Sequence, residues 1–154
     1  MVNYPKVMRD FFRAPENAKL WTETNPDLKS IWFPYMPSRT FLLRAENIGR
    51  SMIWFGLAQT RHVPVLNQWT EAWPVVNVFC WARAKSNSED HVTLAQQRAQ
   101  NMKDMILSIV QANWQSFLPA WQARPTSGER ELPELNIDPI SYTAILPIEF
   151  WQED

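Results

Sequence analysis

The chain has 154 residues, of which 45% are hydrophobic and 20% charged, and its formal net charge is −1. This length fits one domain, and the composition is that of an ordinary soluble globular protein. The near-zero charge excludes a broad electrostatic surface for nucleic acid, and no apolar run reaches the roughly 18 residues of a membrane-spanning helix. The first residues lack the apolar core of a signal peptide, so secretion by that route is not expected.

Glycine, tryptophan and cysteine are used unusually. The three glycines, Gly49, Gly56 and Gly128, are isolated, which excludes a phosphate-binding loop and a dinucleotide-binding fingerprint. Nine tryptophans and twelve prolines are spread along the chain, and so many large amphipathic rings suit partner surfaces as well as a core. The single cysteine, Cys80, cannot form an intrachain disulfide and is interpreted as a small buried hydrophobe.

The first expected element is a short helix that starts at Asn3 or Tyr4 and runs to Ala14. Pro5 suits a first helical turn, and the apolar residues of the segment 7–12 recur on one face. Pro15 ends the helix. Residues 15–39 then form an arm rich in prolines and aromatic residues, which we expect to be extended and mostly without regular structure.

Three strands are predicted between residues 40 and 66: Phe41–Arg44, Arg50–Ala58 and Arg61–Leu66. Asn47 and Gly49 separate the first two runs. Pro64 places the third strand at an edge, because proline cannot donate to a ladder. Residues 67–74 are expected to be a loop.

The most informative stretch follows. In Trp73–Arg83 the residues Val76, Val78, Cys80 and Ala82 alternate with a second set, which indicates a strand. A helix is predicted to begin near Ser86 or Ser88 and to run from His91 to Ala112, about six to seven turns. Its apolar stripe is expected to pack on a sheet that includes the strands around residues 75 and 140; the stripe consists of Val92, Ala95, Ala99, Met102, Ile106 and Ile109.

Residues 114–139 are interpreted as irregular because four prolines interrupt them. The chain closes with a strand at Ile140–Gln152, in which Pro147 suggests a bulge or an edge position. The sequence therefore predicts an α+β fold in one domain spanning 1–154. A mainly antiparallel sheet is packed by one long helix in the C-terminal half and a short N-terminal helix, with the arm at 15–39 and the core at 40–151.

The chemistry-bearing residues do not form a catalytic pattern. His62 and His91 lie far apart with no ligand at metal-binding spacing, and a nucleophilic pair of Cys80 with either histidine is disfavoured by the apolar surroundings of the cysteine. We therefore expect no enzyme activity, no cofactor and no metal. Basic residues at 39, 44, 50 and 61 interleave with Trp54 and Phe55, a pattern found both in single-strand binding surfaces and in ordinary half-buried strands.

The order of elements from Trp73 to Trp151 resembles the tail-terminator, or tail-completion, proteins at the neck of long-tailed bacteriophages. The resemblance implies a structural virion protein that forms a ring, usually of six copies, at the head-proximal end of the tail. Such a ring ends tube growth and joins the tail to the head connector. It also implies assembly in the host cytoplasm, contacts with tail-tube and connector proteins, and at most non-specific contact with passing DNA.

Two alternatives remain at this point: another head–tail neck adaptor, and a tryptophan-rich carbohydrate-binding module. No membrane partner is expected. For the ring, aromatic residues are the expected anchors between subunits. The candidate interface residues are Trp21, Trp32, Phe33, Tyr35, Trp114 and Trp121.

Overall fold

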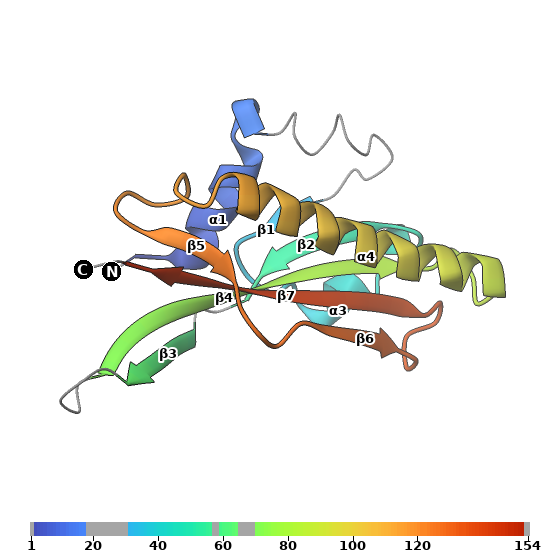
Figure 1. Cartoon of the computed structure of the whole chain (residues 1–154). Coiled ribbons are helices and arrows are strands. Elements are labelled where there is room, and N and C mark those ends of the chain that lie inside the picture. The colour runs from blue at the N-terminus through green and yellow to red at the C-terminus, as the bar shows by residue number, and fades with distance from the viewer. Residues whose placement is uncertain (1, 18–30, 57–58, 65–69, 153–154) are drawn as a thin grey trace.

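The computed structural model describes residues 2–17, 31–56, 59–64 and 70–152. It has an α+β fold in which helices cover a seven-stranded mixed sheet (Figure 1). The helices are α1 (Tyr4–Arg13), α3 (Arg39–Leu42), the 3₁₀ turn η1 (Ala45–Asn47) and α4 (Glu89–Ala112). The strands are β1 (Ile31–Phe33), β2 (Ser51–Phe55), β3 (Gln59–Pro64), β4 (Thr70–Arg83), β5 (Gln122–Pro125), β6 (Arg130–Glu134) and β7 (Ser141–Trp151).

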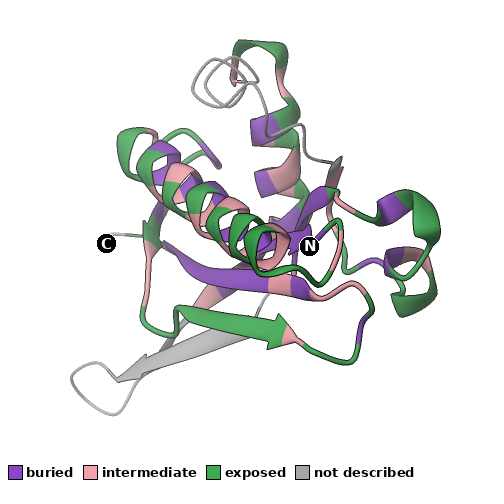
Figure 2. Ribbon diagram, turned by 90° about the vertical axis from the view of Figure 1, so that its right-hand side faces the viewer, coloured by how far each residue is buried: buried purple, intermediate pink, exposed green. Residues whose placement is uncertain are grey.

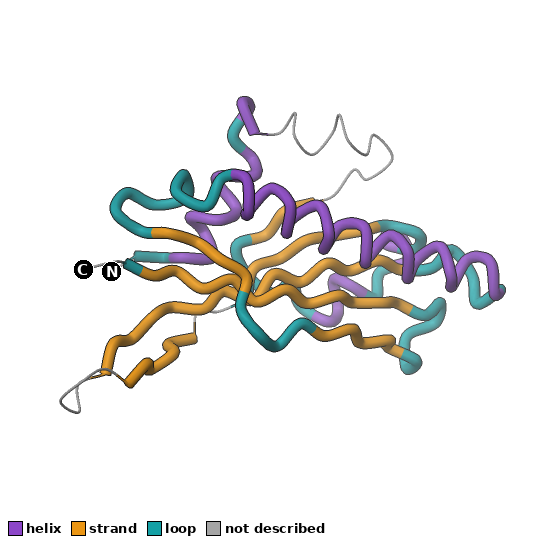
Figure 3. The backbone as a smooth tube through the Cα atoms, viewed as in Figure 1, coloured by secondary structure: helices purple, strands orange, loops and turns teal. Residues whose placement is uncertain are grey.

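The sheet is built around two long antiparallel strands, β4 and β7, whose register runs from Val75 opposite Glu149 to Arg83 opposite Ser141. On the side away from β7, β4 pairs with β3 near its start and with β2 near its end. On the side away from β4, β7 pairs with β6 near its start and with β5 near its end. The short strands therefore lie end to end on either side of the central pair (Figure 3). Among the described strands, only β1 runs parallel to its neighbour, β2.

The strong periodic patterns are confirmed. The α4 helix begins after Ser88, whose side chain accepts a hydrogen bond from the His91 N–H, and it ends at Asn113. Its inward face is buried, as Figure 2 shows, and packs on β4, β7 and β5. Cys80 is buried in the same core. The α1 helix adds Met8 and Phe12 to this core, so both helices cover one face of the sheet.

The opposite face carries a smaller core of Leu42, Met52, Trp54 and Trp81. The prediction of a strand at 41–44 is wrong: α3 includes Phe41 and Leu42, and Leu43 is its C-cap. Ser38 caps this helix, because its hydroxyl accepts a hydrogen bond from the Phe41 N–H at 3.2 Å. A single turn of helix suffices to place Leu42 over the face of the sheet.

Three other predictions need correction. Residues 114–139 are not all irregular, since β5 and β6 lie there; their prolines fit because both strands pair with β7 on one side, at the edge of the sheet. The strand β4 begins at Thr70 and so includes part of the expected loop, because β3 pairs with residues 70–75. The arm contributes β1, while residues 18–30 lie outside the described part of the chain.

Pro147 is neither at an edge nor in a bulge. It lies inside β7, opposite Asn77 of β4. Its carbonyl accepts a hydrogen bond from the Thr126 N–H, so its nitrogen faces the junction where β7 changes partner from β6 to β5. No strand residue pairs there, so the missing N–H costs nothing.

Candidate interaction site

The five predicted interface residues that the structure describes do not form one surface. Trp32 stacks on Phe12 at a centroid distance of 5.1 Å and belongs to the edge of the main core. Phe33 packs against Phe41, and Trp121 against Tyr4. These three rings therefore contact their own chain.

Two members of the predicted set are open to solvent. Tyr35 is 58% exposed and Trp114 is 42% exposed. Tyr35 lies between β1 and α3, whereas Trp114 follows the end of α4. Trp21 falls outside the described residues. Among the described members of the set, only these two rings are exposed, and contact with another subunit stays a prediction for them.

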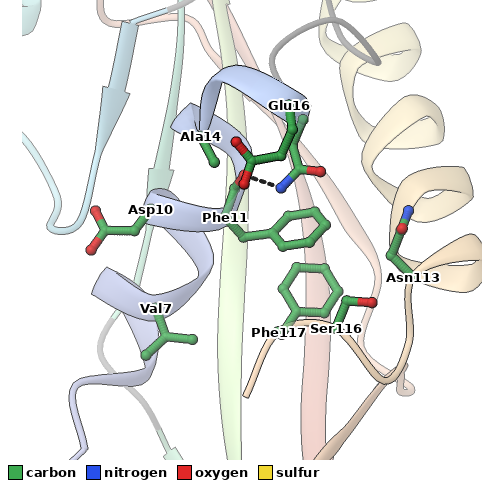
Figure 4. A pocket seen from close by; sticks show the side chains of 9 residues that line it. Val7, Asp10, Phe11, Ala14, Glu16, Asn113, Ser116 and Phe117 are labelled. Atoms are coloured by element: carbon green, nitrogen blue, oxygen red, sulfur yellow. Dashed lines mark hydrogen bonds between the residues drawn. The ribbon is translucent and has the colours of Figure 1, made fainter. Parts of the chain in front are cut away.

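The turn that carries Trp114 borders a groove of about 520 Å³ between the C-terminal ends of α1 and α4 (Figure 4). Its floor is formed by Phe11 and Phe117, whose ring centroids lie 4.2 Å apart at an angle of 37°. The groove is lined by Val7, Asp10, Phe11, Ala14, Glu16, Asn17, Asn113, Ser116 and Phe117. We refer to these nine residues as the α1–α4 groove.

Helix capping builds the rim of this groove. Asn113 ends α4 and donates its side-chain Nδ2–H to the Ile109 carbonyl at 2.9 Å. Asn17, just beyond α1, donates its Nδ2–H to the Phe11 carbonyl at 2.9 Å. Each amide thus donates to a carbonyl near the end of its helix that also accepts a backbone N–H, and each presents its Oδ1 as an acceptor.

The groove is electronegative. Two helix C-termini meet there, each equivalent to a partial negative charge. Asp10 and Glu16 add carboxylates. Asp10 is paired with Arg9 at 2.7 Å, whereas Glu16 is exposed. Arg13 lies outside the lining. An aromatic floor with acceptors around it suits a cationic side chain, which gains both a cation–π contact and hydrogen bonds.

A second polar cluster joins α4 to β6. Lys103 pairs with Glu129, and Tyr142 donates its hydroxyl to Glu131 at 3.0 Å. Burial, which lowers the pKa of Lys103, is outweighed by the hydrogen bond and charge of Glu129, so this pKa is raised. Burial and then the bond to Glu131 raise the pKa of Tyr142. Because every charge here has a partner within the chain, we interpret the cluster as holding β6 against the helix.

The side chain of Arg124 covers the rings of two tryptophans, Trp73 and Trp151. The Arg124 guanidinium lies 4.5 Å from the ring centroid of Trp151 and 5.2 Å from that of Trp73, and it faces Glu149 at 3.6 Å. Rings covered in this way offer little open surface for a sugar, so they do not favour the carbohydrate-binding alternative. In the pattern of basic residues around Trp54 and Phe55, both rings are buried, so neither offers a face on which a base could stack.

The remaining titratable candidates stay apart. His91 contacts the Ser86 hydroxyl at 2.7 Å at the start of α4, and burial raises the pKa of Cys80 above its usual range. Within residues 2–17, 31–56, 59–64 and 70–152, no three side chains of His, Cys, Asp or Glu gather as they would around a metal ion. Over the same residues, no helix combines the length and apolar character needed to cross a membrane.

Sequence reasoning missed the α1–α4 groove because its walls are about 100 residues apart in the chain. The available signals were Asn17 and Asn113, which follow predicted helix ends, and the phenylalanines next to them. Nothing in either local pattern indicates that the two helix ends meet. In comparisons with known proteins, no family model matches the chain and no curated protein sequence is similar to it.

Proposed function

We propose that this protein is a structural component of a phage virion. It forms a ring at the head-proximal end of the tail, ends tube growth and joins the tail to the head connector. In this proposal it acts through contacts between subunits and with tail-tube and connector proteins, and it touches passing DNA only non-specifically. It has no catalytic role.

The observation that carries the proposal is the set of large apolar side chains left open to solvent at several places around the sheet. Leu135 is 73% exposed, Met36 65% and Tyr35 58%. Trp114, at 42%, adjoins the α1–α4 groove. Single exposed apolar residues are common, but several large ones, including a tryptophan ring beside a groove, favour surfaces that are covered in an assembly.

The edges of the sheet support the same proposal. The residues of β6 are exposed, apart from the half-buried Glu134, and this strand pairs with β7 on one side. An edge strand of this kind can accept a neighbouring chain. The order of elements, with one long helix before a terminal strand, supports the resemblance to tail-terminator proteins from which the virion role is inferred.

The test is cryo-electron microscopy of virions assembled with a tagged copy of this chain. The expected result is one ring of density from the tag at the top of the tail. A tag found along the whole tail, on the capsid, or absent from the particles contradicts the proposal. Density in the layer next to the capsid would instead support a neck adaptor.

A further inference from the structure

The two ends of α4 carry surfaces of opposite character. At its C-terminal end lies the electronegative α1–α4 groove. In its N-terminal half Arg98 donates to the Gly49 carbonyl at 3.3 Å, and it lines a small hollow together with Lys85 and Leu94. We call the residues Ile48, Arg50, Lys85, Leu94 and Arg98 the basic end.

The basic end combines positive charge with open apolar surface. Ile48 is 39% exposed and Leu94 41% exposed, and both Arg50 and Lys85 are exposed. Asp90 lies on the neighbouring stripe of α4, while Glu89 precedes Arg98 by nine residues and so lies on the opposite side of the helix. Glu46 is paired with Arg44 at 3.5 Å. The basic end therefore contains three basic residues, and Asp90, at the start of α4, is the one unpaired carboxylate beside them.

We propose that the α1–α4 groove of one copy receives the basic end of the next copy, in a head-to-tail contact. The guanidinium of Arg50 enters over the Phe11 and Phe117 rings and is held by Glu16 and by the Oδ1 atoms of Asn17 and Asn113. Ile48 and Leu94 lie against the rim beside Trp114. This inference rests on the proposed function, because it names the contact from which the ring is built.

A second copy fits better than another occupant for two reasons. The chain itself supplies both complementary surfaces, acidic with an aromatic floor at one end and basic with aliphatic side chains at the other. They also lie far apart on one rigid helix, since Arg98 and Asn113 are 15 residues, or about 22 Å, apart along its axis. Surfaces at opposite ends cannot satisfy each other within one copy, so pairing them between copies produces a heterologous contact that closes into a ring or extends.

Cysteine cross-linking tests the contact directly. One preparation carries Glu16→Cys and the other Arg50→Cys, both positions being exposed, while the native Cys80 is buried. The two are mixed and oxidised with copper–phenanthroline. The expected product is the mixed dimer, formed at least tenfold faster than either self-dimer. Asp104→Cys, an exposed carboxylate elsewhere on α4, is the matched control and should give little product with Arg50→Cys.

Charge reversal is the second measurement. Glu16→Arg and Arg50→Glu should each weaken self-association at least tenfold in sedimentation equilibrium, and the double variant should recover it. Asp104→Arg, at an exposed position outside both surfaces, should leave it unchanged. Circular dichroism checks that each variant is folded.

The inference is overturned if no mixed product forms at about 1 mM, the dissociation constant of a weak contact. It is also overturned if Glu16→Cys cross-links to itself as fast as to Arg50→Cys, or if the double variant stays dissociated. The two proposals fail separately. A tag at the neck without the mixed cross-link removes the contact alone, and the mixed cross-link from a protein absent from virions removes the virion role alone.

Discussion

Replacing Arg83 by methionine should destabilise the fold strongly. This arginine is 4% exposed, and it donates hydrogen bonds to four backbone carbonyls. They belong to Leu42 at 3.3 Å, Arg44 at 3.2 Å, Asp138 at 2.7 Å and Pro139 at 3.2 Å. One side chain at the end of β4 thus joins the α3–η1 segment to the loop that leads into β7.

The magnitude follows from these contacts. A hydrogen bond from a charged group contributes about 1.5–3 kcal/mol, so four bonds would sum to roughly 6–12 kcal/mol if each counted in full. Burying the guanidinium costs several kcal/mol, which offsets part of that sum. Methionine relieves this cost but leaves the carbonyls without a donor. The expected net loss is about 3–5 kcal/mol, a large fraction of the 5–15 kcal/mol that stabilises a typical domain.

The assay is urea unfolding at 25 °C, followed by circular dichroism. With a slope of roughly 2 kcal/mol/M, the midpoint of Arg83→Met should fall by about 1.5–2.5 M. Arg83→Lys should lie in between, because one ammonium group cannot reach all four carbonyls. The control Arg130→Met removes an exposed arginine from β6 and should change stability by less than about 0.5 kcal/mol. If the free energy of unfolding of Arg83→Met lies within about 1 kcal/mol of that of the native chain in this assay, the four bonds do not stabilise the fold as argued.

Three further outcomes are expected. Ile106→Asp places a carboxylate at a fully buried position of α4, so the purified variant should lack the native near-ultraviolet spectrum; a native spectrum would show that this stripe is not core. Because the pKa of Tyr142 is raised in the folded state, its contribution to stability is present below about pH 10 and is lost as the pH rises through the folded value. Tyr142→Phe should therefore lose less stability than the native chain when the pH rises from 9 to 11, as reported by thermal melts. Equal losses in the variant and the native chain would contradict this. Gly49 has a φ of 77°, and an added Cβ would meet the Lys85 Cγ at 2.8 Å, so Gly49→Ala should cost about 1–2 kcal/mol in calorimetry; an unchanged melting temperature would refute it.

The parts of the fold that were predictable are those whose pattern is set by burial of the element itself. The apolar stripe of α4 and the alternation in β4 and β7 reflect direct contact with the main core, so both are visible in the sequence. The strand β6 is different. Its sequence Arg-Glu-Leu-Pro-Glu is mostly polar, and its conformation is imposed by pairing with β7. The short helix α3 likewise depends on one cap and one buried leucine.

The candidate site could be predicted only in fragments. Trp114 was predicted to lie at a subunit interface, and the structure places it just after the end of α4, where it is 42% exposed. The groove beside it depends on two helix ends meeting over the sheet, which no local pattern encodes. Trp32 was expected to contact a neighbour. In the structure it stacks on Phe12 of its own chain, because β1 joins the sheet beside β2 and brings the ring under α1.

The division of each outer edge into two short strands also has a practical consequence for labelling this protein. The turn between β5 and β6 joins two segments whose registers are each fixed separately by β7. It is exposed at Ser127 and Gly128, and Gly128 has a φ of 112°. Extra residues inserted between these two would lengthen a surface loop without shifting any strand, at a modest cost in loop-closure entropy. This turn is therefore the place to insert a peptide tag without disturbing the central pair of strands or either end of α4.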